Sequence, residues 1–459
     1  MVAPIYYYST NRQFSNQSSG DFERISFQEA LFQGQAQDEG LFMPDRIPKV
    51  SPEELRQLPH MRYPEIASLV LGKFLRPEIS ASVLSQLARE AYTFEIAIES
   101  LGEKRYLMRL DQGPTASFKD FAAQMLARLM GYFNRNGNYL NLLVATSGDT
   151  GSAIGRAFQG IPGIFVYILY PRQEVSPKQE AQLTSINGNV RAVSVDGKFD
   201  DCQKMVKSAF LDPELRLFHL TSGNSINIGR LLPQMVYYFY AYSRLAKYEE
   251  KVIFSIPSGN FGNAIGCEIA YRMGLPVEKI IIATNENDEF PGFLQNGRYE
   301  KISPSRRCLS NSMNVGHPSN LGRLFDLYGG NVDKDGYVHR NPDRTAMRRH
   351  IFGVGISDSE TIDTMVRIWR EKKVILEPHG AVAFAGLESF REQEGEPDLP
   401  QIVLETAHPG KFSEVLQEYL GVTPEMPESL KHLQLKNHYI VLPNEYRIFK
   451  EYLFENLKR

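Results

Sequence analysis

Short apolar runs alternate with amphipathic segments over most of the chain beyond residue 139. The runs are six or seven residues long and rich in Val, Ile and Leu; they occupy 140–146, 164–169, 190–195, 251–257, 279–284 and 401–406. Continuous apolar character of this length is typical of parallel strands covered on both faces. Helical patterns lie between them, over 177–187, 201–210, 229–247 and 262–273. Strands that alternate with helices predict an open α/β fold, with two such units.

The remaining segments differ in pattern and suggest domain limits. Helical periodicity over 53–58 and 64–90 sets residues 1–95 apart as an N-terminal domain. Residues 285–350 are rich in Asn, Gly, Pro, Arg and Ser and predict a long irregular region. The full prediction is a larger α/β domain from 96–139 and 220–423, a smaller α/β domain from 140–219, and a C-terminal extension from 424–459 without a clear pattern.

Charge and composition exclude several classes of protein. Among 459 residues, 51 Lys and Arg face 54 Asp and Glu, a net charge of −3, which argues against nucleic-acid binding through bulk charge. No apolar stretch is long enough to span a membrane, and the N-terminus lacks the basic and apolar regions of a secretory signal. Three scattered cysteines form no metal-binding pattern and suit a reducing compartment. We therefore expect a cytoplasmic protein without a bound metal.

A nine-residue sequence occurs twice. SGDTGSAIG at 147–155 returns as SGNFGNAIG at 258–266, an offset of 111 residues. Each copy follows a predicted strand and opens a predicted helix, and a Gly-rich turn at a helix N-terminus binds anions. The two copies therefore indicate two anion sites across a cleft, although two tight turns that use Gly only for packing are the alternative. Neither copy matches a dinucleotide or Walker motif, which favours phosphate on a smaller molecule.

The segment GPTASFKDF at 113–121 places one lysine in an unusual setting. Ser117 and Asp120 have the spacing of a capping box, which puts Lys119 in the first turn of a helix, between two phenylalanines. A helix N-terminus and partial burial both disfavour the charged form, whereas Asp120 would favour it if its carboxylate lies close. A neutral lysine amine is what Schiff-base chemistry requires. Alone, Lys119 is more typical of a surface lysine; beside two anion sites it suggests a lysine that binds pyridoxal phosphate.

Seven segments together resemble the threonine synthase family of fold type II pyridoxal-phosphate enzymes, in its longer bacterial and fungal form. They run in the family's order from residue 38 to residue 412: DEGLFMP (38–44), GPTASFKDF (113–121), ATSGDTGSA (145–153), NSINIGR (224–230), PSGNFGN (257–263), PHGAVA (378–383) and ETAHPGKF (405–412). The resemblance implies two open α/β domains with pyridoxal 5'-phosphate in the cleft between them, plus a smaller N-terminal domain.

The resemblance also assigns roles to individual residues. Lys119 would form the Schiff base and act as the catalytic base, and Thr406 would face the pyridine nitrogen. The cofactor phosphate would lie on the loop of Gly259, Asn260, Phe261, Gly262 and Asn263. The ligands of the substrate phosphate would be Ser147, Thr150, Ser225, Asn260 and Arg230. Asp149 would lie near the ring hydroxyl of the cofactor, where shorter relatives have Asn, so its carboxylate must be protonated or turn away.

The implied reaction converts O-phospho-L-homoserine and water to L-threonine and phosphate. A related phospho-lyase that releases 2-oxobutyrate, ammonia and phosphate is the alternative within the same family. In the alternative interpretation, Ser225 and Asn227 cap the helix at 229–247, and Arg230 is a solvated helix residue. We expect His379 and His408 to be packed, hydrogen-bonded residues rather than catalysts. The expected partner is the small-molecule substrate alone, and the expected state is a monomer or homodimer.

Overall fold

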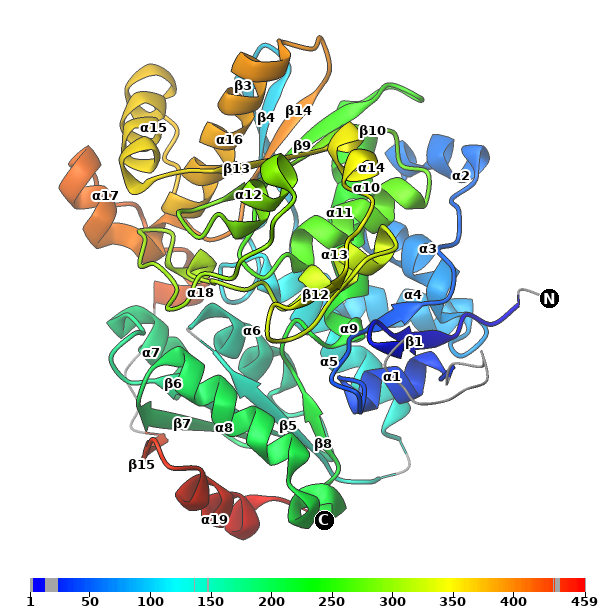
Figure 1. Ribbon diagram of the computed structural model, residues 1–459, viewed down its shortest axis with the longest axis vertical. Coiled ribbons are helices and arrows are strands. Elements are labelled where there is room, and N and C mark those ends of the chain that lie inside the picture. The colour runs from blue at the N-terminus through cyan, green and yellow to red at the C-terminus, as the bar shows by residue number, and fades with distance from the viewer. Residues whose placement is uncertain are drawn as a thin grey trace.

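Two open β-sheets, each covered by helices on both faces, form the two main parts of the molecule (Figure 1). The computed structural model describes residues 3–12, 24–135, 137–146, 148–431, 433 and 438–458. All six predicted apolar runs are strands, and each pairs in parallel with its neighbours among the other runs. The pattern of buried parallel strands separated by helices is therefore confirmed.

The larger sheet has six strands. Their order is β13 (Ile351–Gly355), β10 (Val277–Thr284), β9 (Val252–Pro257), β14 (Gln401–Glu405), β4 (Arg105–Arg109) and β3 (Ala97–Gly102). All pairs are parallel except β3–β4, which closes the edge as an antiparallel hairpin. Successive side chains of a strand point to opposite faces. On β9, Ile253 therefore packs against α16 (Pro378–Glu394), whereas Phe254 joins the core with α10 (Val236–Leu245) and α11 (Gly262–Arg272).

The smaller sheet has five parallel strands. Their order is β15 (Tyr439–Pro443), β7 (Val190–Asp196), β6 (Ile164–Pro171), β5 (Leu140–Ala145) and β8 (Leu220–Ser222). α6 (Asp149–Phe158) and α7 (Pro177–Thr184) lie on one face; α8 (Phe199–Leu211) and α19 (Tyr446–Asn456) cover the other. Leu142 of β5 faces α6, and Leu143 faces α8, so this sheet also has two apolar faces.

The N-terminal segment packs against the larger part (Figure 1). It contains the antiparallel pair β1 (Tyr7–Ser9) and β2 (Phe42–Pro44), and four helices: α1 (Phe27–Gln33), α2 (Pro52–Gln57), α3 (Tyr63–Leu75) and α4 (Ala81–Ala91). The apolar face of α3 contacts α10, and α4 contacts α5 (Lys119–Phe133). The N-terminal segment thus buries one side of the helices that carry the candidate site.

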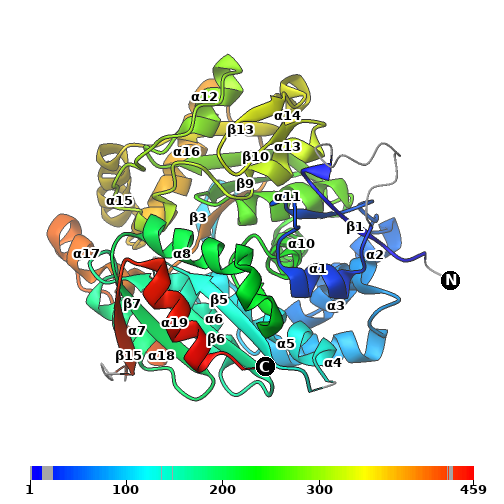
Figure 2. The ribbon, with the colours of Figure 1, turned by 60° about the horizontal axis from the view of Figure 1, so that its bottom comes forward.

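Two segments without a clear sequence pattern are structured. Strand β15 adds to the edge of β7, and α19 packs on α8, so the C-terminal segment completes the smaller part (Figure 2). Residues 285–350 hold the short elements α12 (Glu289–Asn296), α13 (Leu321–Leu327), β11 (Asn331–Val332), β12 (Val338–Arg340) and α14 (Arg344–His350). Strands β8 and β15 show that the smaller sheet draws on residues outside 140–219; the domain limits themselves stay a prediction.

The predicted helix over 229–247 is interrupted. It consists of α9 (Ile228–Leu231), a 3₁₀ turn (Leu232–Met235) and α10, because Pro233 has no N–H to donate within an α-helix. The larger part is completed by α15 (Asp358–Lys372), α17 (Ser413–Leu420) and α18 (Glu428–Lys431). Within the part of the chain that the structure describes, none of the helices combines the length and apolar character that a bilayer-spanning segment needs.

Candidate active site

Lys119 is the first residue of α5 and lies where strand β14 ends. The N–H of Phe118 donates to the carbonyl of Thr406 at 2.9 Å, and the N–H of His408 donates to the carbonyl of Ala116 at 3.1 Å. These bonds join the loop before Lys119 to the residues that follow β14. Thr406 is buried and comes directly after the strand. The fold therefore brings Lys119 and Thr406 to the same edge of the larger sheet.

The predicted capping box at Ser117 and Asp120 is wrong. Phe118 is the N-cap residue of α5 and makes no side-chain cap, and the buried hydroxyl of Ser117 has no hydrogen-bond partner among the described residues. The carboxylate of Asp120 instead accepts the backbone N–H and the hydroxyl of Thr115, each at 2.8 Å. Asp120 thereby folds the preceding loop back onto the helix.

The environment of Lys119 favours its neutral form. The side chain is only 15% exposed, and its Nζ lies 4.9 Å from the centre of the Phe118 ring. Burial lowers the pKa of Lys119, and the charges of Lys411 and Arg230 lower it further. The opposing carboxylate is Asp149, not the predicted Asp120: Lys119 Nζ lies 3.7 Å from Asp149 Oδ2. The predicted direction of the pKa shift is confirmed, and its main cause is desolvation.

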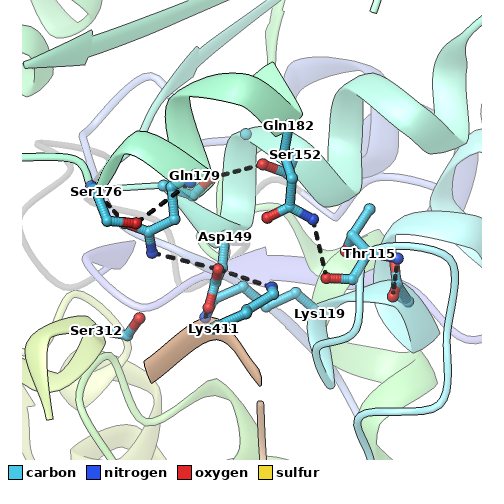
Figure 3. Close-up of polar contacts among 12 residues, drawn as sticks. Thr115, Lys119, Asp149, Ser152, Ser176, Gln179, Gln182, Ser312 and Lys411 are labelled. Carbon is cyan, nitrogen blue, oxygen red and sulfur yellow. Dashed lines mark hydrogen bonds and ion pairs between the residues drawn. The ribbon is translucent and has the colours of Figure 1, made fainter. Parts of the chain in front are cut away.

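Asp149 bridges two lysines at the start of α6 (Figure 3). Its Oδ1 accepts from Lys411 Nζ at 3.0 Å and from Gln179 Nε2 at 3.4 Å. Burial by itself would raise the pKa of Asp149, but Lys411 and Lys119 hold it well below its usual range. Asp149 is therefore ionised, with its charge directed at lysines. Lys411 belongs to the ETAHPGKF segment, yet sequence reasoning gave it no role.

The loop after β9 is shaped for an anion. Phe261 has a left-handed backbone (φ 62°), which is uncommon for a non-glycine residue, and it opens α11. A Cβ on Gly259 would lie 2.9 Å from Met313 Cα and 3.0 Å from the Ser312 carbonyl oxygen. Among the described residues, the backbone N–H groups of 259–263 have no hydrogen-bond acceptor. Several donors at the positive end of a helix are thus available together.

The matching loop after β5 opens α6 in the smaller part. Gly148 has φ 137°, and a Cβ there would lie 2.6 Å from the Gln179 side chain. The Thr146 hydroxyl accepts the N–H groups of Gly148 and Gly151, which fixes the turn. Thr150 is half-buried in the first turn of α6, beside Asp149. Ser147 lies outside the described residues.

Ser225 lies on the segment that leads into α9, and Arg230 lies in that helix. Arg230 is buried (3% exposed), so it is not the solvated helix residue of the alternative interpretation. Its Nη1 donates to the Gly223 carbonyl at 2.8 Å, whereas its buried Nε has no partner among the described residues. Burial lowers the pKa of Arg230 to about 10. Asn227 caps α9 through the N–H of Gly229, which leaves Ser225 free of a capping role.

Both histidines of the family-like segments are packed and hydrogen-bonded, as predicted. His379 Nδ1 pairs with the buried Glu377, and its Nε2 accepts the N–H of Ser312 at 3.2 Å. His408 Nδ1 accepts the N–H of Gly410 at 3.0 Å, and burial lowers the pKa of His408 to about 4. His379 therefore supports the Ser312–Met313 backbone that backs Gly259.

Comparisons with known proteins agree with this geometry. Residues 93–404 match the family "Pyridoxal-phosphate dependent enzyme", residues 7–92 match "Threonine synthase N terminus", and residues 380–453 match "Threonine synthase, C-terminal". Threonine synthase of Haemophilus influenzae is 37% identical over 439 residues, 95% of this chain and 98% of that protein.

Two solved structures have nearly the same fold. Pyridoxal-phosphate-bound threonine synthase of Brucella melitensis superimposes with a TM-score of 0.89 at 35% identity, covering 99% of this chain and 100% of that one. Threonine synthase of yeast gives 0.87 at 31% identity, covering 98% of each chain. The chain therefore belongs to the threonine synthase family of fold type II, pyridoxal-phosphate-dependent enzymes.

Proposed function

We propose that this protein converts O-phospho-L-homoserine and water into L-threonine and phosphate. The observation that carries the proposal is the meeting of two groups in one place: a buried lysine whose pKa is lowered, and a buried arginine that forms no ion pair with a carboxylate of the described residues. Lys119 and Arg230 are close enough for the arginine's charge to lower the pKa of Lys119. A neutral amine suits carbonyl chemistry, and an unpaired guanidinium suits a phosphate.

The residues fit pyridoxal 5'-phosphate. In the proposal, the free N–H groups of Gly259, Asn260, Phe261, Gly262 and Asn263 hold the cofactor phosphate, and Lys119 Nζ binds the aldehyde. The Thr406 hydroxyl lies on the same edge of the sheet and faces the pyridine nitrogen. Asp149 holds the two lysines beside the ring. This assignment is supported by the close backing of Gly259, where any Cβ would meet backbone atoms.

The substrate phosphate is assigned to Thr150, Ser225, Asn260, Arg230 and the predicted ligand Ser147. A phosphomonoester carries close to two negative charges at neutral pH. Arg230 is a fitting partner, because its buried Nε has no acceptor in the part of the chain that the structure describes and its planar fork matches phosphate oxygens. Ser225 and Asn260 are both half-buried, so they are within reach of a ligand.

The chain's own residues then move protons and hold the leaving group. Pyridoxal phosphate supplies the electron sink that makes the Cα and Cβ hydrogens of a bound amino acid acidic. Lys119 Nζ takes the Cα proton, and its lowered pKa increases the share of neutral amine that can do so. After a Cβ proton is lost, the Cγ–O bond breaks and phosphate leaves with its bridging oxygen. Arg230 retains the phosphate while Cγ takes up a proton, water adds its hydroxyl at Cβ, and a proton returns to Cα to give threonine.

The wider setting of the enzyme is also proposed. We infer a cytoplasmic enzyme that acts on this small molecule without nucleic acid or membrane, as a monomer or homodimer. The larger domain (96–139 and 220–423) carries Lys119 and the cofactor loop, and the smaller domain (140–219) carries Asp149 and Thr150.

The product ratio tests the proposal. Cofactor-saturated protein is incubated with O-phospho-L-homoserine, and phosphate, threonine and 2-oxobutyrate are measured in one sample. Equal amounts of phosphate and threonine are expected. Phosphate with an equal amount of 2-oxobutyrate would assign the phospho-lyase reaction instead, and the absence of any product would contradict the substrate.

A further inference from the structure

Arg323 is a fully buried arginine in the region that sequence analysis predicted to be irregular. It is 0% exposed and lies on α13. Its guanidinium donates only to neutral oxygens: the carbonyls of Phe42 (3.1 Å), Ser225 (3.1 Å) and Ile226 (2.5 Å), and Asn320 Oδ1 (2.6 Å). No carboxylate of the described residues forms an ion pair with it. The molecule therefore keeps an uncompensated positive charge directly behind Ser225.

Asn320 connects Arg323 to Ser225 and Asn260, two of the proposed ligands of the substrate phosphate. Because its Oδ1 accepts from Arg323, its Nδ2 must point the other way. There it donates to Ser225 Oγ at 3.2 Å and to the Asn260 carbonyl at 2.9 Å. One fully buried amide thus joins the segment before α9 to the loop before α11.

These hydrogen bonds leave the side-chain hydrogens of Ser225 and Asn260 available to the substrate phosphate. Since Ser225 Oγ accepts from Asn320, its own hydrogen remains to be donated. The Oδ1 of Asn260 accepts the hydroxyl of Ser319 at 3.0 Å, which leaves the two N–H bonds of the Asn260 side chain. Ser319 and Asn320, which directly precede α13, therefore donate to oxygens of Asn260 and Ser225 and leave the hydrogens of these two side chains for an anion.

We propose that Asn320 and Arg323 are positioning residues for the substrate phosphate, which orient the donors of Ser225 and Asn260 and supply buried positive charge behind them. The inference rests on the proposed function, because it takes Ser225, Asn260 and Arg230 as the phosphate ligands. A buried charge without a partner is costly to the free protein. The substrate phosphate supplies the missing negative charge near both Arg230 and Arg323.

The proposal also gives a role to the DEGLFMP segment. Phe42 of this segment contributes the carbonyl that holds Arg323 Nε, and Phe42 pairs with β1 as part of β2. Arg323 thereby ties the N-terminal segment, the Ser225 segment and α13 to one another.

The test is the substitution Asn320→Asp in the cofactor-loaded enzyme. The carboxylate has the shape of the amide and still accepts from Arg323, but it cannot donate to Ser225 or Asn260, and it cancels the charge of Arg323. We expect the KM for O-phospho-L-homoserine and the inhibition constant of inorganic phosphate each to rise about tenfold or more, with a smaller change in kcat.

Asn331→Asp is the matched control. Asn331 is also buried, lies eleven residues further along the same region, and donates to the Thr10 carbonyl at 2.8 Å, away from the phosphate ligands. It should lower thermal stability without weakening phosphate inhibition. Asn320→Ala adds no charge and serves if the aspartate variant does not fold; there we expect a rise of about threefold to tenfold, an order-of-magnitude figure for the loss of neutral hydrogen bonds.

The substitution Arg230→Lys distinguishes a failure of the positioning role from a failure of the proposed phosphate site. If Arg230→Lys weakens phosphate binding and both Asn320 variants match the unmodified enzyme, the positioning role is overturned and the proposed phosphate site stands. If none of these variants changes phosphate binding, the phosphate site itself is wrong, and the positioning role falls with it.

Discussion

Lys411 Nζ lies 3.0 Å from Asp149 Oδ1, so a second buried lysine shares the carboxylate that faces Lys119. The arrangement has opposite effects on Lys119. Asp149 raises its pKa, whereas Lys411 both repels the Lys119 charge and occupies one oxygen of Asp149. Lys411 thus limits the pairing that would keep Lys119 protonated.

Replacing Lys411 with Met should therefore raise the pKa of Lys119. The repulsion is lost, and Asp149 is left to pair with Lys119 alone. The check is the pH dependence of the rate at which the cofactor aldehyde adds to the apoprotein, whose midpoint should move to higher pH. Lys178→Met is the control, because Lys178 binds Gly410 and Ser413 in the same region without contacting Asp149. An unchanged or lower midpoint for Lys411→Met would remove Lys411 from this role.

Replacing Lys119 with Ala should abolish turnover and the covalent attachment of the cofactor. The amine is the only group of this side chain that can add to the aldehyde or take the Cα proton. Borohydride reduction followed by peptide mapping of the unmodified protein should place the cofactor on the peptide that contains Lys119, and Lys251→Ala, a change at an exposed lysine, should leave this result unaltered. A cofactor found on any other lysine would refute the assignment.

Replacing Gly259 with Ala should weaken cofactor binding by about tenfold, an order-of-magnitude value for overpacking. The new Cβ would lie 2.9 Å from Met313 Cα and 3.0 Å from the Ser312 carbonyl oxygen, so backbone must move. Equilibrium titration of the apoprotein with pyridoxal phosphate measures the effect. Gly292→Ala, a helical position with no atom within 4 Å of its Cβ, should keep normal affinity. Equal affinities for both variants would count against the 259–263 loop as the binding site of the cofactor phosphate.

Glu405 is fully buried, and its burial raises its pKa well above the usual range. The nearby charge of Glu377 raises this pKa further. In the unfolded chain Glu405 loses its proton near pH 4.5, whereas in the folded protein it keeps the proton to a higher pH. Above that pH the unfolded state binds fewer protons, so the free energy of unfolding falls as pH rises, by at most about 1.4 kcal/mol per pH unit.

Replacing Glu405 with Gln should remove this dependence. Gln cannot ionise, yet it keeps an oxygen to accept the Glu377 N–H, which lies 3.0 Å from Glu405 Oε1. Denaturant titrations between pH 5 and 8 should show a stability advantage of the variant that grows with pH. Glu99→Gln serves as the control, since Arg109 contacts both carboxylates, Glu405 at 3.3 Å and Glu99 at 2.8 Å, but Glu99 is 41% exposed. Parallel pH profiles for Glu405→Gln and the unmodified protein would show that Glu405 is not protonated.

The sequence predicted those parts of the molecule that rest on local pattern. Continuous apolar runs located β5, β6, β7, β9, β10 and β14, because strands buried on both faces need apolar side chains at every position. The sequence pattern did not predict the short edge strands β8 and β15, since strands of three and five residues carry little pattern, and β15 also has exposed positions. Their places are set by tertiary pairing with β5 and β7.

The candidate site likewise contains some residues that the sequence pattern predicted and others that it did not. Lys119 and the two Gly-rich loops stand out because each is a local motif at the start of a helix. Lys411, Asn320 and Arg323 did not, because their importance comes from contacts with residues 60 to 281 positions away in the chain. Asp120 shows the converse: its spacing from Ser117 suggested a cap, but Thr115 offers two donors and binds the carboxylate instead.

The fate of water oxygen tests the central claim most directly. The cofactor-loaded enzyme is supplied with O-phospho-L-homoserine in H₂¹⁸O, and both products are analysed by mass spectrometry. Because phosphate leaves with the bridging oxygen and water adds at Cβ, the account predicts one ¹⁸O in the hydroxyl of threonine and none in the phosphate. Label in the phosphate would mean that the P–O bond is hydrolysed, and unlabelled threonine or labelled 2-oxobutyrate in its place would contradict water addition at Cβ.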